Sequence, residues 1–269
     1  MGRTDQQGIV ATVRILEDCN RQYEGKVKDK GDSVRILGVG SPTITETTDK
    51  NIKLKDAEDV EDTSVIMPIN HIAHFNYKVD DIDKRQAVGG VMEALSKETS
   101  EKLASKMDAF IANLALDKLA VKDSPTAYLV EEANILRKID DALQQLYEND
   151  VSTKTEVVLT CSPRFYFILK RAYTKLDTDN SDMLKNGRVG RYGNVTVKMS
   201  NNVATANNKA EDRIMLRTKR AIAFVNPMTH TEAYRPEKGF SDAVKGFVLY
   251  DGKIVRPKEM IVMNTKYTA

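Results

Sequence analysis

The sequence predicts an α+β fold, in which a few helices are mixed with mostly antiparallel strands. Two helical patterns, at 86–121 and 131–149, stand in the middle of the chain, and from residue 213 onward nearly every apolar run is a strand pattern. The regular alternation of strand and helix that marks a parallel sheet is missing. The 269 residues are enough to bury a core of their own, in one large domain or two small ones.

Residues 24–78 are expected to be extended segments around a charged stretch. Polar and apolar side chains alternate in three short runs, at 34–36, 43–45 and 75–79, which is the period of a strand. Residues 46–64 carry seven acids, three lysines and almost no apolar side chains. Such a composition buries little surface by itself. We therefore expect a projecting hairpin, whose charged end rests on another molecule.

Residues 86–121 form the strongest helical pattern of the chain. Its apolar side chains recur mostly at steps of three or four, at Val88, Met92, Leu95, Leu103, Met107, Phe110, Ile111 and Leu114. Gly89 and Gly90 favour a start after Gly90, and Pro125 marks the far limit. At ~1.5 Å per residue, about 30 residues make a rod of about 45 Å. A rod of this length is expected to lie along one face of a larger body.

A second mixed region follows the long helix. The helix at 131–149 is followed by a strand at 156–161, and Ser162–Pro163 then supplies an N-cap and a first helical proline. The helix that begins there is expected to turn inward Phe165, Ile168, Leu169, Ala172, Tyr173 and Leu176. Asn186–Gly187 predicts a tight turn. The remaining strand patterns lie at 194–200 and in several short runs after residue 213.

Charge is distributed unevenly along the chain. The 41 basic and 39 acidic side chains give a net charge of +2, yet residues 1–150 carry −8 and residues 151–269 carry +10. Complementary halves indicate either pairing within the chain or contact between copies. The seven acids of the projecting segment favour contact between copies.

No apolar run is long enough to span a membrane, and the N-terminus fits neither a secretory signal nor a myristoylation site.

The search for reactive residues predicts no catalytic residue, no cofactor and no metal site, so an enzyme is not expected. The three histidines (His71, His74 and His230) and the two cysteines (Cys19 and Cys161) form no zinc motif. We expect both thiols to be free in a reducing compartment, with Cys161 packed in the core. Asp80, Asp81 and Asp83 could bind a divalent cation, but helix-start capping or pairing with a neighbour's basic residues is favoured. The glycines at 38 and 40 do not complete a phosphate-loop motif.

Basic side chains without acids close by in the sequence are candidates for a surface that meets phosphate. They are Arg164, Lys170, Arg171, Lys175, Lys185, Arg188 and Arg191. Only Tyr192 accompanies the second group, so the aromatic residues needed for base stacking are too few. A solvated or subunit-facing surface is therefore favoured over a dedicated nucleic-acid site.

Several short segments, in this order and spacing, carry a likeness to a known family. They are Tyr23–Gly25, Lys30–Ile36, Phe75–Lys84, Val157–Tyr166, Gly187–Gly193 with Ser200–Asn202, Glu232–Pro236 and Asp242–Gly246. In this arrangement the chain resembles, over nearly its whole length, the major capsid proteins of tailed bacteriophages. The resemblance implies the phage-capsid (Hong-Kong-97-like) fold. That fold has an N-terminal arm, an extended loop, a long spine helix in a peripheral domain, and a mixed α/β axial domain.

The resemblance also implies a division of the chain. Its expected parts are an N-terminal arm (1–23), an extended loop (24–78), a peripheral domain with the spine helix (79–124), an axial domain (125–220) and closing strands that return to the peripheral domain (221–269). The chain begins almost at the arm, so we expect a separate scaffold or none. Some family members crosslink a loop lysine to a neighbour's asparagine. Lys50, Lys53 and Lys55 are present, but we do not expect this crosslink.

By this resemblance the chain is expected to be a structural protein that assembles into hexamers and pentamers of an icosahedral shell around double-stranded DNA. Its partners would be itself, packaged DNA contacted without sequence specificity, and a portal, scaffold or decoration protein, with assembly in the host cytoplasm and no membrane contact. The loop residues expected between subunits are Glu46, Asp49, Lys50, Lys53, Lys55, Asp56, Glu58, Asp59, Glu61 and Asp62. Two alternatives remain: an encapsulin-like nanocompartment shell, and a DNA-binding protein that uses the basic C-terminal half.

Overall fold

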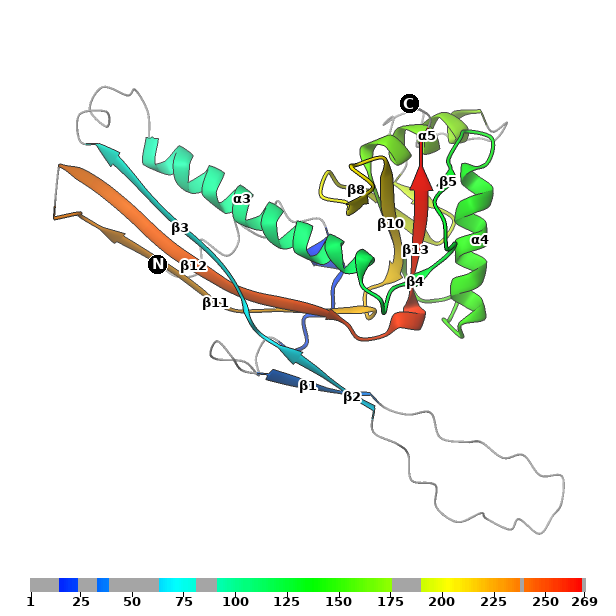
Figure 1. Ribbon diagram of the computed structural model, residues 1–269, viewed down its shortest axis with the longest axis horizontal. Coiled ribbons are helices and arrows are strands. Elements are labelled where there is room, and N and C mark those ends of the chain that lie inside the picture. The colour runs from blue at the N-terminus through cyan, green and yellow to red at the C-terminus, as the bar shows by residue number, and fades with distance from the viewer. Residues whose placement is uncertain are drawn as a thin grey trace, which may run out of the picture.

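The protein has an elongated part and a compact part, with a hairpin that projects from the elongated one (Figure 1). The computed structural model describes residues 15–23, 33–38, 63–80, 91–175, 190–237 and 240–267. Predictions made for 43–45, for Asn186–Gly187 and for the start of the long helix before residue 91 lie outside these residues.

The compact part is built on an eight-stranded mixed sheet in the order β4-β13-β10-β6-β8-β7, with β5 paired to β13 and β9 to β10. These strands are β4 (Val121–Lys122), β5 (Tyr128–Leu129), β6 (Val157–Cys161), β7 (Arg191–Tyr192), β8 (Val195–Met199), β9 (Thr205–Ala206), β10 (Glu211–Thr218) and β13 (Met260–Lys266). Alternate side chains of the sheet form one core with the buried faces of α4 (Ile135–Glu148) and α5 (Pro163–Thr174). The two helices therefore cover the same face of the sheet.

The elongated part is an antiparallel three-stranded sheet in the order β11-β12-β3. Its strands are β11 (Ile222–Tyr234), β12 (Ser241–Ile254) and β3 (His71–Asp80). The long helix α3 (Val91–Asn113) lies along one face of this sheet (Figure 1). A second core joins the C-terminal half of α3 to the compact sheet's other face and to a short 3-10 turn, η1 (Leu16–Asp18).

The projecting hairpin is formed by β1 (Ser33–Gly38) and β2 (Thr63–Pro68), which pair antiparallel along all six residues. Its base packs Val34, Ile36 and Met67 against Ala223 and Val225 of β11. The neighbouring residues of β11 face α3, so the hairpin is seated on the opposite face of the long sheet. The strand predicted at 34–36 is present as β1, but its partner β2 was not among the predicted runs, and the run predicted at 75–79 lies in β3, which pairs with β12 instead.

Most element predictions are confirmed, but the end of the long helix needs correction. The helix at 131–149, the strands at 156–161 and 194–200 and the helix start at Ser162 are present. The long helix was expected to reach 121, but α3 ends at Asn113 and continues only as the 3-10 turn η3 (Leu114–Leu116). There Asp117 is extended and its carboxylate accepts the N–H of Leu119. This turn directs the chain into β4, so the 23 residues of α3 make a rod of about 35 Å.

The closing strands are longer and fewer than the separate short runs of the sequence predict. The runs AIAFV and THTEAY are one strand, β11, with a register shift between Val225 and Met228 against β12. β3 pairs along its whole length with β12, although most of it falls inside the segment expected to be the extended loop. Among the described residues, no helix is both long and apolar enough to cross a membrane.

Candidate assembly surfaces

The base of the hairpin is packed against the long sheet. Val34, Ile36, Met67 and Ile69 are buried against the long sheet, and Lys253 Nζ donates to the carbonyl of Ile66 at 2.9 Å. The ten loop residues expected between subunits, Glu46, Asp49, Lys50, Lys53, Lys55, Asp56, Glu58, Asp59, Glu61 and Asp62, lie outside the described residues. Their contact with another copy therefore stays a prediction.

The first group of basic candidates lies on α5, whose N-terminus is capped as the sequence predicts. The hydroxyl of Ser162 accepts the N–H of Phe165, and Pro163 occupies the first helical position. Arg171 Nε and Lys175 Nζ both donate to the carboxylate of Glu132 at 2.5 Å. The hydrogen bonds from Lys175 and then from Arg171 lower the pKa of Glu132.

The basic candidates differ in whether they already have a partner within the chain. Glu132 partly neutralises Arg171 and Lys175, whereas Arg164 makes one long hydrogen bond, 3.5 Å, to the carbonyl of Lys209. Arg191 is exposed on β7. Lys170 is half-buried on α5, and Lys185 and Arg188 lie outside the described residues. Two of the basic candidates, Arg171 and Lys175, are therefore paired within the same chain. The sequence did not indicate this pairing, because Glu132 lies 39 and 43 residues away from them.

Several large apolar side chains are exposed on the described surface. Phe240 is the most exposed of them, at 79%, and stands at the distal end of the long sheet where β12 begins. Phe167 on α5 is 52% exposed, and Ile66 on β2 is 57% exposed. Exposed apolar side chains mark a contact surface when they form a contiguous patch, whereas these three lie on or next to separate elements. Phe240 and Ile66 lie on the two projections of the molecule, the sheet tip and the hairpin.

The outer face of the long sheet, away from α3, also exposes aromatic groups. Cross-strand pairing aligns His74, Phe247 and His230 in one row, and the rings of His230 and Phe247 lie 5.7 Å apart. Two residues along β12 on the same face, Lys245 lies over the ring of Tyr234, and its Nζ pairs with Glu232 at 3.2 Å. This face is a broad, mixed polar and aromatic surface with no helix on it in the described residues.

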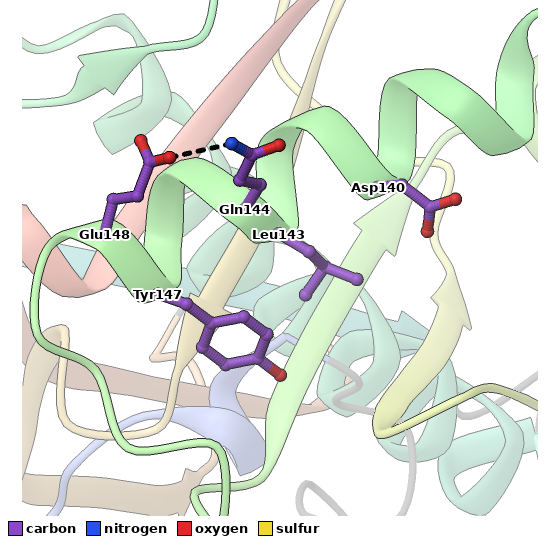
Figure 2. A pocket seen from close by; sticks show the side chains of 5 residues that line it. All are labelled: Asp140, Leu143, Gln144, Tyr147 and Glu148. Atoms are coloured by element: carbon purple, nitrogen blue, oxygen red, sulfur yellow. Dashed lines mark hydrogen bonds between the residues drawn. The ribbon is translucent and has the colours of Figure 1, made fainter.

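A shallow depression runs along one side of α4 (Figure 2). Leu143 and Tyr147 form its apolar floor, and Asp140, Gln144 and Glu148 line its edge; Gln144 Nε2 donates to Glu148 at 2.7 Å. The hydroxyl of Tyr192 donates to Asp140, and burial together with this bond raises the pKa of Tyr192 to about 12. The depression is formed by one helix and brings together no nucleophile and base.

The residues considered for chemistry occupy structural positions. Both cysteines are free and buried, and burial raises the pKa of both thiols, that of Cys161 to about 12. His71 faces α3 and contacts Asp251 at 3.0 Å, whereas His74 lies on the other face, as a spacing of three in a strand requires. Within the part of the chain that the structure describes, no group of three or more His, Cys, Asp or Glu is placed to hold a metal ion. Asp80 ends β3, and Asp81 and Asp83 lie outside that part.

Sequence reasoning missed one cluster of buried charges, at the junction between the two parts. Arg217 is fully buried in β10, and Asp108 and Asp18 are nearly so. The available signal was Asp108, which stands within the apolar stripe of the long helix, next to Met107 and three residues before Ile111. A charge on an apolar face indicates a buried partner.

Comparison with known proteins identifies the fold. No family model matches the chain, and no curated protein does. Among solved structures, a chain from Mycobacterium phage Che8 is 25% identical with a TM-score of 0.77 and covers 93% of this chain and 90% of its own. The capsid of cyanophage P-SCSP1u is 15% identical with a TM-score of 0.74 and covers 95% and 89%. A virus-like particle from Pyrococcus furiosus is 13% identical with a TM-score of 0.63 and covers 96% and 95%.

These likenesses extend over both parts of the molecule, since each covers more than nine tenths of the chain. The chain thus has the Hong-Kong-97-like fold of tailed-bacteriophage major capsid proteins.

Proposed function

We propose that this chain is a major capsid protein, whose copies form the hexamers and pentamers of an icosahedral shell around double-stranded DNA. One observation carries the proposal: a phage-capsid fold that covers more than nine tenths of the chain. The role is structural, and the protein resides in the virion capsid after assembly in the host cytoplasm. Portal, scaffold and decoration proteins are further partners that a shell of this kind uses.

The division of the chain follows the same proposal. Residues 1–23 act as the N-terminal arm, 24–78 as the extended loop, 79–124 as the peripheral domain, 125–220 as the axial domain and 221–269 as the closing strands. The antiparallel β1–β2 pair supports the assignment of the extended loop. The end of that segment lies in β3, which pairs with β12 of the long sheet. A neighbour's loop would then cover surface that a single copy leaves exposed.

Electrostatics supports contact between copies alongside pairing inside the chain. Glu132, from the acidic half, already pairs with Arg171 and Lys175 of the basic half, so part of the charge asymmetry is satisfied internally. The seven acids of residues 46–64 belong to the segment that we propose as the extended loop. Exposed charge pairs weaken with salt, so assembly is expected to weaken as ionic strength rises.

Deletion of residues 46–62 tests the proposal. The deleted protein should keep its circular dichroism spectrum and melting transition, because the hairpin base lies outside the deletion, but it should fail to form stable shells by negative-stain electron microscopy. The matched control replaces the seven acids with Asn or Gln at unchanged length, which separates the loop's presence from its charge. Normal, stable particles from the deletion would contradict the proposal. So would a wild-type protein that stays monomeric at high concentration with and without a scaffold.

The contents of purified particles test the alternatives. Mass spectrometry that finds a cargo enzyme and no DNA would favour an encapsulin-like compartment. Tight, salt-dependent DNA binding by unassembled subunits would favour a DNA-binding protein. A shell protein should bind DNA only weakly in the unassembled state.

A further inference from the structure

A short segment near the N-terminus, residues 15–20, lies in the junction between the elongated and the compact parts; we call it the strap. On the elongated side, the carboxylate of Asp108 in α3 accepts the N–H groups of Ile15 and Leu16, both at 3.2 Å. Asn20 pairs with β11: its N–H donates to Ile222 at 2.8 Å, and its carbonyl accepts from Phe224 at 3.0 Å. The strap is thus hydrogen-bonded to the helix and the long sheet.

The compact part holds the strap from the other side. Arg217 of β10 is 0% exposed, and its guanidinium donates to the carbonyls of Asp18 and, at 2.9 Å, Ile15, with a weaker contact to Cys19 Sγ at 3.7 Å. Lys198 of β8 pairs with Asp18 at 2.9 Å and with Glu17 at 3.5 Å. Strands of the compact sheet therefore contact the same few residues that α3 and β11 contact.

The burial of these charges makes the strap necessary for a closed junction. A buried guanidinium or carboxylate is tolerated only where hydrogen bonds replace its lost hydration. The acceptors named above for Arg217 all belong to the strap, and so do the two N–H groups bound by Asp108. Without the strap, Arg217 would lose the carbonyl acceptors named above, Asp108 would lose two backbone donors, and the hydrogen bonds by which this segment contacts both parts would be lost together.

We infer that the junction is a binding site for the strap, and that the bound strap fixes the elongated and compact parts in one relative orientation. The ligand class is a short peptide segment with backbone carbonyls aimed at one buried arginine, backbone N–H groups aimed at one buried aspartate, and an acidic side chain for a lysine. The chain supplies this ligand from its own N-terminal region. The inference stands independently of the proposed function; in a shell, this orientation would set the curvature that the subunit imposes.

The two native cysteines provide the first test in the full-length protein. Cys19 lies in the strap and is 7% exposed, and Cys161 lies in the core of the compact part and is 0% exposed. The probe is a thiol-reactive maleimide at pH 8, with each site's labelling followed by peptide mass spectrometry. The test variant is Arg217→Met, which keeps much of the buried volume but removes the donors to the strap.

In Arg217→Met, Cys19 should label at least tenfold faster than in the wild type, while Cys161 stays protected. The change cannot come from thiol acidity, because the Arg217 charge lowers the pKa of Cys19, so its removal alone would slow the reaction. The matched control is Ser105→Ala, which weakens an exposed hydrogen-bonded link from α3 to Asn202 and should leave both thiols protected. Unchanged Cys19 protection in Arg217→Met would overturn the inference. Joint labelling of both cysteines would also overturn it, because Arg217 would then support the whole fold rather than a separable strap.

A distance measurement tests the orientation itself. Spin labels at Lys97→Cys on α3 and Gln144→Cys on α4, both exposed positions, span the junction in a Cys19→Ala background, so that Cys19 takes no label in Arg217→Met. Labelled chain is diluted with unlabelled chain so that only distances within one copy are seen. The distance distribution should be narrow in the wild type and in Ser105→Ala, and clearly broader in Arg217→Met. A narrow distribution in Arg217→Met, together with fast Cys19 labelling in the first test, would show that the strap does not set the orientation. Neither readout requires shells, so failure here is distinguishable from failure of the proposed function.

Discussion

The compact and the elongated parts bury their strands differently. In the compact part, β6 is buried at every position and β13 at all but its last, because helices cover one face of the sheet and the junction core covers the other. In the elongated part, β3 has one buried residue, and its outward-facing side chains are exposed. The compact part is therefore stabilised by its own core, whereas the elongated part buries most of its central strand β12 but leaves the outer face of its edge strand β3 exposed.

The helices repeat this contrast. The four buried residues of α4 are spread from Ile135 to Leu146, almost its whole length. The six buried residues of the longer α3 lie only between Leu103 and Ala112. The N-terminal half of α3 thus lies over the sheet with little apolar burial of its own. An element built in this way gains most from contact with another molecule, which is the condition expected of a shell subunit.

The largest expected effect follows from a truncation in the compact core. Phe165 is 0% exposed between α5 and the sheet, and Phe165→Ala should cost about 3–5 kcal/mol of unfolding free energy. The matched variant in the elongated part is Phe75→Ala, at a half-buried residue of β3 under α3, which should cost about 1–2 kcal/mol. Urea denaturation of unassembled subunits measures both. Equal losses would show that the two parts are stabilised alike.

A smaller effect is expected where the long sheet has no room for a side chain. A Cβ at Gly246 would lie 2.5 Å from the carbonyl oxygen of His230 and 2.7 Å from the ring of Phe75. Gly246→Ala should therefore cost about 1–3 kcal/mol, because backbone and ring must both shift. Gly190→Ala is the control, since a Cβ there meets nothing within 4 Å. A melting temperature of Gly246→Ala equal to that of the wild type would mean that the long sheet can shift at this point without loss of stability.

Most of the helices and strands that the sequence predicted correctly depend on contacts between residues close together in the chain. The Ser162–Pro163 helix start depends on a hydrogen bond within three residues, and the stripe of α4 depends on one helix alone, so both are visible in the sequence. The end of α3 was misplaced because the apolar spacing continues to Leu114 and beyond into η3. The turn at Asp117 and the pairing of β4 with β13 then override local preference.

Long-range pairing could not be predicted from the sequence. Arg217 meets the strap about 200 residues away in the chain, and Glu132 meets Arg171 and Lys175 across 39 and 43 residues. The alternating pattern of β11 is interrupted at the register shift between Val225 and Met228, so the sequence predicted two short strands where there is one long strand. These features depend on which surfaces the fold brings together, and only the charge of Asp108 within an apolar stripe signalled one of them in advance.

A further, modest loss is expected from removing the cap of α5. The hydroxyl of Ser162 satisfies the N–H of Phe165 at 3.4 Å, so Ser162→Ala should cost about 1 kcal/mol. Ser152→Ala is a suitable control, because its hydroxyl accepts the N–H of Lys154 in an exposed turn and its loss should be within about 0.5 kcal/mol. Urea midpoints at constant slope would measure both. A loss at Ser162 no greater than that at Ser152 would contradict a structural role for the cap.

The smallest expected effect compares an ion-pair network between α5 and the residues just before α4 with a single ion pair within α3. Glu132 accepts from Arg171 and Lys175 and so ties the approach to α4 to α5, whereas Glu98 pairs only with Lys102 one turn away on α3. In each case hydrogen bonds to the cations lower the pKa of the carboxylate. The stabilising contribution should therefore be present above the unfolded-state pKa of glutamate, about 4.3, and disappear as the pH falls through the lower folded-state value.

Glu132→Gln should accordingly lower the melting temperature slightly at neutral pH, with the difference from wild type vanishing toward pH 3 and shrinking in high salt. Glu98→Gln should have a smaller effect, since a pair one turn apart on a helix restrains nothing beyond that turn. Calorimetric melting at pH 7 and pH 3 would compare the two. If Glu98→Gln cost as much as Glu132→Gln, charges on the elongated part would support its stability more than its thin core indicates, and the contrast between the two parts would rest on apolar burial alone.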